Sequence, residues 1–380
     1  MSSSGFNATL LIGPTVPVPA PINLLNAINT IQVTNTDEGR DGFQITFDVG
    51  RSGPEDIADY QVLNSQLLNV FNRVIIMVNF GLEPNVLIDG IITHQELTPT
   101  QEPGKSTLTV TGEDVSVMMD MEEKTQTFPN MPDMLIASQI ISSYAQYGLV
   151  PNITPPESVD VPLILDWIPS YQGSDYSYLQ YLASKNAYRF YIEPTAVPGV
   201  NNAYWGPLNL VPPIPQSSLS VTMGPDTNVK SISFRYNALR PFFINSNVND
   251  SLTNSSIPVQ TFASLRPPLS SEPAWLVNQP NVRAKQMESG GLSVMEAFTK
   301  AQALTDDSTD AVTATGELDS VAYGDILQAR KLVGVRGAGY SYDGIYYVKS
   351  VTHTIKLGEY KQSFTLARGG VGSSISTVSL

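Results

Sequence analysis

Residues 42–49 read Gly42-Phe-Gln-Ile-Thr-Phe-Asp-Val49, so that apolar and polar side chains alternate along the chain. This period of two is typical of a half-buried antiparallel strand, because successive side chains of a strand point to opposite faces of the sheet. Three further segments with turn residues between them also predict strands: 73–80, 86–95 and 106–112. Short strands separated by turns indicate a small barrel or sandwich in this part of the chain.

A helical period replaces the strand period in three places. Apolar residues recur at three- and four-residue spacing from Pro132 to Gly148 and again over 175–186. The third helix is expected to begin at Ser293, where Ser-Val-Met-Glu296 fits a capping box, and to run to about Leu304. Strand character returns over 229–236 and 325–368. The sequence therefore predicts a mainly β protein with an α/β insert.

Composition excludes several classes of function. The chain has 380 residues, no Cys, two His, 21 Lys plus Arg and 35 Asp plus Glu, which gives a formal net charge of −14. Without Cys there are no disulfides, thiol nucleophiles or Cys-ligated zinc, and two His cannot make a three-His metal site. The acidic balance argues against specific nucleic-acid binding or a headgroup-binding surface. We expect no cofactor and no metal.

No part of the sequence predicts contact with a membrane core. The longest apolar run, Val74 to Val78, is far short of the about 20 residues of a membrane span. The N-terminus has no basic segment and is interrupted by prolines, unlike a signal peptide. We therefore expect no membrane insertion by this chain, and a protein that is made and matured without export.

Two strand-rich parts of the sequence resemble each other. Asp89-Gly-Ile91 and Thr93-His94 in the first part have counterparts in Asp343-Gly-Ile345 and Thr352-His353 in the second. A real duplication predicts that Asp89 and Asp343 match, each on a turn or strand start at the same place of a barrel. The match is short, and hairpins share turn residues by chance, so duplication and coincidence both remain open.

Possible catalytic side chains have simpler structural interpretations. The carboxylates after Gly112, namely Asp114, Asp120, Glu122 and Glu123, could suggest a glycosidase pair. An acidic turn between a strand and a helical region explains them better, because no substrate-shaping pattern is visible in the sequence. His94 and His353 lie in or beside predicted strands, where hydrogen-bonded structural histidines are common. No motif in the sequence specifies catalysis.

Three stretches together resemble a known family. The run from Leu108 to Glu123, LTVTGEDVSVMMDMEE, is similar to the end of the first barrel of the late control protein D family, the tail hub proteins of contractile phages, which are related to the non-spike part of VgrG proteins. Residues 134–191 and 344–368 match the family in order and spacing. The departures are Asn186-Ala187 in place of a usual Gly, and residues 245–282, for which we find no counterpart.

The resemblance implies a structural baseplate hub that is not an enzyme. A homotrimer with two similar barrels per chain would form a pseudo-sixfold ring and adapt the hexameric inner tube to a trimeric spike. The spike is expected to be a separate protein because the sequence ends after the second barrel. Its expected partners are itself, the inner tube protein, the spike protein and baseplate wedge or LysM-type adaptor proteins. The expected family-signature and structural residues are Asp89, Gly90, Gly112, Asp114, Asp343, Gly344, His353 and Arg368.

The alternative is a hub with an additional cell-wall-degrading activity in the insert. We expect the following parts: an N-terminal arm (1–28) and a flexible tail (372–380), both ordered only in the particle; a first barrel (29–126); the α/β insert (127–215); a second barrel (216–245 and 315–371); and a loop and helix insertion (246–314). The sequence does not distinguish a phage from a tailocin or an injection system.

Overall fold

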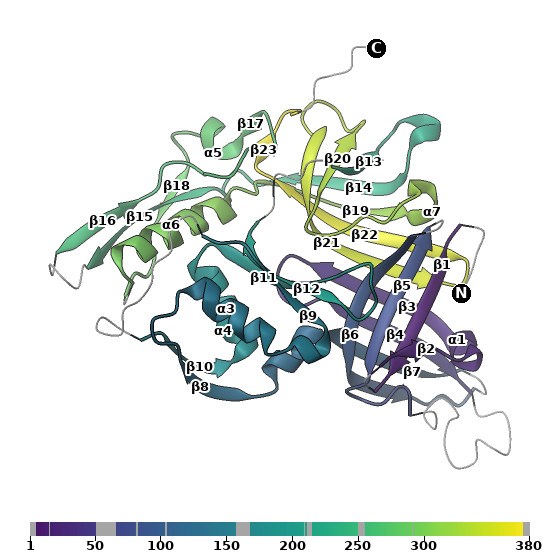
Figure 1. Cartoon of the computed structure of the whole chain (residues 1–380). Coiled ribbons are helices and arrows are strands. Elements are labelled where there is room, and N and C mark those ends of the chain that lie inside the picture. The colour runs from purple at the N-terminus through teal and green to yellow at the C-terminus, as the bar shows by residue number, and fades with distance from the viewer. Residues whose placement is uncertain are drawn as a thin grey trace. The chain divides into compact units, whose positions relative to one another are not determined.

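The structure is a computed structural model that describes residues 5–14, 16–50, 66–80, 83–102, 105–156, 168–208, 210, 215–249, 255–290 and 292–374 (Figure 1). The chain forms two compact units, and each is described by itself. Unit 1 contains residues 1–179, 190–205 and 352–362. Unit 2 contains residues 180–189, 206–351 and 363–380.

Unit 1 is built on an antiparallel sheet in the order β3-β4-β7-β6-β5-β1-β2. Its strands are β1 (Asn7–Gly13), β2 (Val18–Pro19), β3 (Ile28–Thr36), β4 (Gly42–Val49), β5 (Arg73–Phe80), β6 (Glu83–Thr98) and β7 (Ser106–Asp114). In β4 the alternating side chains Phe43, Ile45 and Phe47 are buried, as the period of two predicts. The prediction of a mainly β protein is confirmed.

The N-terminal segment is not the free arm that its prolines predicted. Residues 7–13 form β1, which pairs with β5 along its whole length and buries Leu10 and Ile12. The short helix α1 (Ile22–Ala27) follows and buries Leu24. The prediction was wrong because it gave weight to the prolines and overlooked the alternating apolar residues of 7–13, which bury enough surface to hold the segment in the sheet.

The expected α/β insert is present and belongs mostly to unit 1. It contains the strand pair β8 (Glu123–Thr127) and β10 (Ser170–Ser174), and a small sheet in the order β11-β12-β9. The remaining bounds are β9 (Leu149–Ile153), β11 (Tyr188–Pro194), β12 (Asn201–Pro207), α3 (Asp133–Ser142) and α4 (Asp175–Lys185). The helix expected to continue to Gly148 ends at Ser142 and is followed by a 3₁₀ turn over Ala145–Tyr147.

Gly148 ends that turn because no other residue fits its position. Its φ is +78°, and a Cβ added there would lie 1.9 Å from the carbonyl oxygen of Gly199. Both the left-handed backbone and the close approach of the turn between β11 and β12 require glycine.

Strands of unit 2 belong to the same 13-stranded sheet and have the order β14-β19-β22-β21-β20-β13. Its strands are β13 (Gln216–Ser220), β14 (Val229–Tyr236), β19 (Val312–Asp319), β20 (Leu332–Arg336), β21 (Gly344–Lys356) and β22 (Glu359–Arg368), and α7 (Ser320–Tyr323) follows β19. One core cluster includes Val312, Val333, Tyr346, Val351 and Leu366. The strand expected over 229–236 is confirmed as β14.

The segment expected to be a loop and helix insertion contains a third small sheet. Strands β16 (Ser256–Gln260), β15 (Phe242–Asn249) and β18 (Arg283–Lys285) lie side by side in that order, and α6 (Val294–Ser308) packs on them. The predicted boundary at 245 therefore divided β15. Ser293 caps α6 with both bonds of the capping box, so that prediction is confirmed. The short elements β17 (Glu272–Pro273), α5 (Ala274–Val277) and β23 (Gly370–Val371) complete the unit.

Most of the expected C-terminal tail, residues 375–380, lies outside the described residues. The hairpin of β21 and β22 contributes residues 352–362 to unit 1. There Thr34 Oγ1 on β3 and Thr352 Oγ1 on β21 lie 3.1 Å apart, and β21 follows β3 in the strand order. The edge of β3 is thus covered by a strand from the far end of the sequence.

Candidate functional site: two strand blocks of equal order

Two sets of five strands in this chain have the same topology. We call β3, β4, β5, β6 and β7 block 1, and β14, β19, β20, β21 and β22 block 2. When the strands of each block are numbered along the chain, both blocks have the spatial order first, second, fifth, fourth, third. Each block also has one added strand beside its third strand, β1 antiparallel in block 1 and β13 parallel in block 2.

An aromatic ring covers a glycine between the second and fifth strands of each block. In block 1 a Cβ added at Gly112 on β7 would lie 2.5 Å from the ring of Phe43 on β4. In block 2 a Cβ added at Gly316 on β19 would lie 2.6 Å from the ring of Phe364 on β22. The ring lies on the second strand in block 1 and on the fifth strand in block 2, and the glycine lies on the other strand of the pair. The contact between a ring and a glycine therefore occurs in both blocks.

The tripeptide Asp-Gly-Ile does not mark the same place in the two blocks. Asp89 lies inside β6, opposite Ile75 of β5, whereas Asp343 precedes β21. The expected match of Asp89 with Asp343 is therefore wrong, and so is the expectation of a turn or strand start for Asp89. Only residues 81–82 separate β5 from β6, whereas residues 337–343 connect β20 to β21, so the same three letters fall at different heights of their sheets.

Asp89 is the centre of a buried polar network in unit 1. Arg73 Nε donates to Asp89 Oδ1 and Arg73 Nη2 to Asp89 Oδ2, both at 2.7 Å, and Asn201 Nδ2 donates to Oδ2 at 2.9 Å. Arg73 Nη2 also donates to the carbonyl oxygens of Tyr147 at 2.8 Å and Gly199 at 3.2 Å. The network fastens the insert to β5 and β6. Sequence analysis did not single out Arg73 or Asn201, although a basic residue at the head of an apolar run was a signal.

Asp114 caps a turn at the end of β7. Its Oδ1 accepts from the backbone N–H of Ser116 at 2.8 Å and its Oδ2 from that of Asp41 at 2.9 Å. Burial raises the pKa of Asp114 to about 6, and the negative charge of Asp41 adds to the rise. Gly90 is the cross-strand partner of Asp114, so four predicted residues, Asp89, Gly90, Gly112 and Asp114, lie in one part of block 1.

Arg40 binds two further carboxylates, one in β7 and one after it. It donates to Glu113 Oε2 at 3.1 Å and to Asp120 Oδ2 at 2.8 Å, and its guanidinium carbon lies 3.7 Å from the ring centroid of Tyr176. A cation above an aromatic face and between two carboxylates holds neighbouring segments in place. The arrangement supports the structural interpretation of these acidic residues.

The second group of predicted residues meets in unit 2. Arg368 is fully buried and donates to the carbonyl oxygens of Asp343 at 2.9 Å and of Ser341. Its guanidinium lies over the ring of Tyr346, and Nη1 is 2.9 Å from the place of a Cβ on Gly344. Gly344 is therefore required so that Arg368 can tie the loop before β21 to the end of β22.

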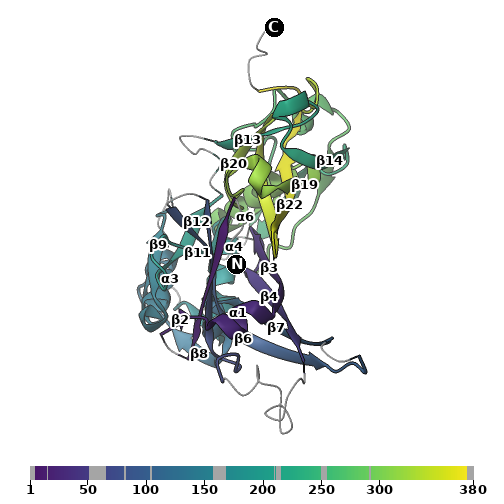
Figure 2. The same cartoon turned by 90° about the vertical axis from the view of Figure 1, so that its right-hand side faces the viewer.

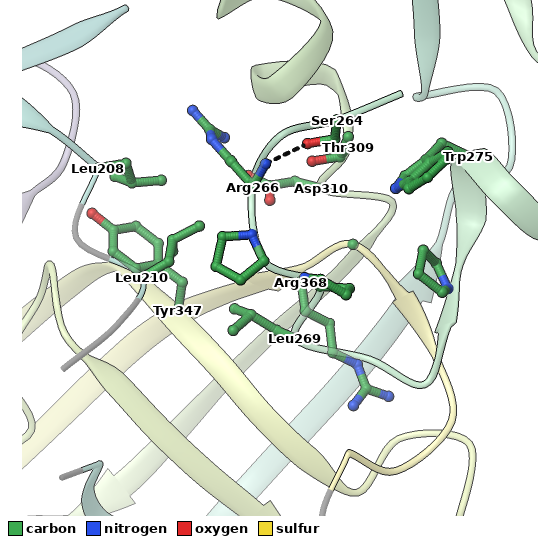
Figure 3. A pocket seen from close by; sticks show the side chains of 14 residues that line it. Leu208, Leu210, Ser264, Arg266, Leu269, Trp275, Thr309, Asp310, Tyr347 and Arg368 are labelled. Carbon is green, nitrogen blue, oxygen red and sulfur yellow. Dashed lines mark hydrogen bonds between the residues drawn. The ribbon is translucent and has the colours of Figure 1, made fainter. Parts of the chain in front are cut away.

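A small cavity adjoins Arg368 (Figure 3). It has a volume of about 30 Å³, which is room for one water molecule, and Asp310, Arg266 and Tyr347 are among its lining residues. In Figure 3 the guanidinium of Arg368 points away from Asp310. Burial raises the pKa of Asp310, although Lys349 Nζ lies 4.0 Å away and opposes the rise.

His353 and His94 occupy different surroundings. His353 is buried, with Nδ1 2.8 Å from the hydroxyl of Tyr360, and burial lowers its pKa to about 3. His94 is exposed and lines a groove of about 510 Å³ on the sheet of unit 1, together with Gln32, Thr34, Gln44 and Thr111. Uncharged polar side chains dominate this groove. Within the residues that the structure describes, no group of three acidic or His side chains is arranged to hold a metal ion.

Solved structures of other proteins are similar to this chain. A tail protein from Neisseria meningitidis MC58 superposes with a TM-score of 0.66 over 97% of this chain and 98% of its own, at 11% identity. The 43 kDa tail protein of prophage MuSo2 from Shewanella oneidensis gives 0.65 over 95% and 98%, at 13% identity. This chain has the fold of phage tail proteins. The resemblance found in the sequence is thus confirmed at the level of the fold.

The tail-protein fold extends to secretion systems. The E. coli c3393 protein, described as a component of the type VI secretion system with structural similarity to the T4 tail proteins gp27 and gp5, gives a TM-score of 0.55 over 90% of this chain and 73% of its own, at 12% identity. No protein-family model and no curated protein matches the sequence. Among the residues of this chain that the structure describes, no helix is long and apolar enough to cross a membrane.

Proposed function

We propose that this chain is the baseplate hub of a contractile phage tail or injection particle. In this role a homotrimer adapts the hexameric inner tube to a separate trimeric spike. The observation that carries the proposal is the equal strand order of block 1 and block 2 within one chain. Each block supplies one hub barrel, and β1 joins the first of them.

The symmetry argument explains why a hub needs two similar blocks. A ring of six identical subunits cannot dock equivalently on a ring of three, because each closed ring has its own rotation operator. Three chains with two blocks each present six similar surfaces to the tube and keep threefold symmetry toward the spike. The insert and the sheet with α6 have no counterpart in the other block, so they face the spike or the baseplate wedges.

The chemistry of the described residues supports a structural role. Asp89, Asp114, Glu113 and Asp120 all accept hydrogen bonds that hold neighbouring segments together. In the insert, Asp175 accepts from the hydroxyl of Tyr144 at 2.8 Å and from Lys124 at 2.7 Å. A carboxylate held in this way is a poor general acid or base. The hub is therefore proposed to be non-enzymatic, a component of the particle assembled in the bacterial cytoplasm.

Two experiments test the proposal. Native mass spectrometry of the purified full chain is expected to show a homotrimer that binds the tube protein and a spike protein encoded nearby. A strictly monomeric chain that binds neither protein would contradict it. Peptidoglycan zymography separates the alternative role, since clearing by the wild-type chain that is lost in Asp175→Asn would establish a wall-degrading insert.

A further inference from the structure

The first strand of block 1 has neighbours on both sides. Strand β4 pairs with one side of β3, and β21 follows on the other side. The part of β21 that belongs to unit 1 is Thr352–Lys356, and the Thr34–Thr352 contact lies there. Neither edge of β3 is available for another chain.

The first strand of block 2 is open on one side. Strand β14 pairs with β19 over its whole length and is the end of the strand order, so no strand in the described part of the chain covers its other edge. The side chains of Lys230, Ser231, Ser233 and Arg235 are exposed. An open edge of eight residues offers unpaired N–H and C=O groups to an incoming strand.

The strand that covers β3 has a counterpart in block 1. Strand β21 is the fourth strand of block 2; its residues 344–347 pair with β20, which leaves 352–356 for β3. Strand β6 is the fourth strand of block 1; its residues 83–91 pair with β5. Residues 94–98 of β6 pair with β7 on one side. On the other side no strand of the described chain pairs with them, although the side chain of Gln95 donates to the carbonyl oxygen of Leu68. Figure 2 shows this end of β6 projecting from the sheet.

The charges of the two open edges are opposite. Strand β14 contains Lys230 and Arg235 and no acidic residue, whereas residues 94–98 contain Glu96 and no Lys or Arg. Lys230 lies 3.4 Å from Asp319, so Arg235 is the charge most available to a partner. Two β14 edges facing each other would oppose like charges, which disfavours a symmetric pair and favours a head-to-tail contact.

We propose that β14 of one copy of this chain pairs with residues 94–98 of β6 in a second copy, as β3 pairs with β21 within one chain. The pairing rests on the proposed trimeric hub and specifies its interface. Because β14 and β6 are different surfaces, the contact is heterologous and closes only as a ring. Within each copy the first strand of block 1 lies beside the fourth strand of block 2. Between copies the first strand of block 2 would lie beside the fourth strand of block 1. All neighbouring blocks of the ring would therefore be joined by the same kind of strand pair.

Cysteine cross-linking tests the pairing directly because the natural chain has no Cys. Thr98→Cys protein is mixed with Ser231→Cys or Ser233→Cys protein and oxidised. One of the two mixtures is expected to give a covalent dimer on a non-reducing gel. The corresponding double variant, Thr98→Cys/Ser231→Cys or Thr98→Cys/Ser233→Cys, is expected to give a covalent trimer. The matched control replaces Ser256, which is exposed on β16, an edge strand of another sheet, and is expected to give no cross-link with Thr98→Cys.

Charge reversal provides a second readout that does not depend on disulfide geometry. Glu96→Arg and Arg235→Glu are each expected to weaken self-association by about 3- to 10-fold, as measured by analytical ultracentrifugation, since exposed pairs contribute modestly. The double variant is expected to recover most of the loss. A trimer that forms without the β14–β6 cross-links, or single variants that associate like wild type, would overturn the pairing and leave the hub intact. A chain that stays monomeric would overturn both.

Discussion

Arg73 and Asp89 are joined by two hydrogen bonds of 2.7 Å inside unit 1, where both side chains are almost completely buried. Asn201 and the carbonyl oxygens of Tyr147 and Gly199 complete their hydrogen bonding. A buried pair is stable only when its remaining donors and acceptors are satisfied in this way. The ion pair therefore holds the insert on block 1.

Replacing Asp89 with Asn is expected to lower the free energy of unfolding by about 3–5 kcal/mol, because the charge of Arg73 stays buried without its partner. Urea unfolding followed by circular dichroism measures the loss. Glu102→Gln is the control, since its ion pair with Lys105 is 69% exposed at the carboxylate and its loss is expected to cost less than about 1 kcal/mol. Equal effects of the two substitutions would contradict a structural role for the network.

The ring-on-glycine contacts predict the same response in both blocks. Gly112→Ala and Gly316→Ala each place a methyl group within 2.4 Å of a backbone carbonyl, that of Ile91 or of Ser231, as well as against a ring. Each is expected to destabilise the chain by about 1–3 kcal/mol, as overpacked cores do. Gly290→Ala meets no atom within 4 Å and is the control for thermal unfolding. If only one block responded, the two contacts would not be equivalent.

Asp114 predicts a pH dependence of stability. Its pKa is raised to about 6 in the folded chain, against about 4 in an unfolded one, so between these values the folded state holds a proton that the unfolded state has released. This group therefore stabilises the fold most below about pH 4, and the contribution is lost as the pH rises through about 6.

From pH 5 to pH 7 the wild-type chain is expected to lose about 1 kcal/mol relative to Asp114→Asn. Urea unfolding of both proteins at the two pH values measures this difference, and all other groups cancel in it. Parallel pH profiles of the two proteins would show that Asp114 is not the titrating group.

The periodicity of the sequence correctly predicted several individual strands and the start of one helix. Strands β4, β5 and β14 have the predicted bounds, and the Ser293 capping box begins α6 as expected. In each case the alternation of side chains or the cap is complete within a few residues, so no distant contact is needed to specify the element.

The contacts that assemble the site could not be predicted in this way. Asp89 meets Asn201, which is 112 residues away in sequence, and β3 is covered by a strand that begins at Gly344. The Asp-Gly-Ile echo pointed to a duplication, but its two copies lie at different heights of their sheets. The better signal, an equal strand order, exists only in three dimensions.

An electron cryo-microscopy image of the assembled particle would show whether three copies of this chain adapt a sixfold tube to a threefold spike. We expect three copies around the axis, with block 1 and block 2 alternating in one ring against six tube subunits. Six copies around the axis, or a ring in which only one of the two blocks faces the tube, would contradict it.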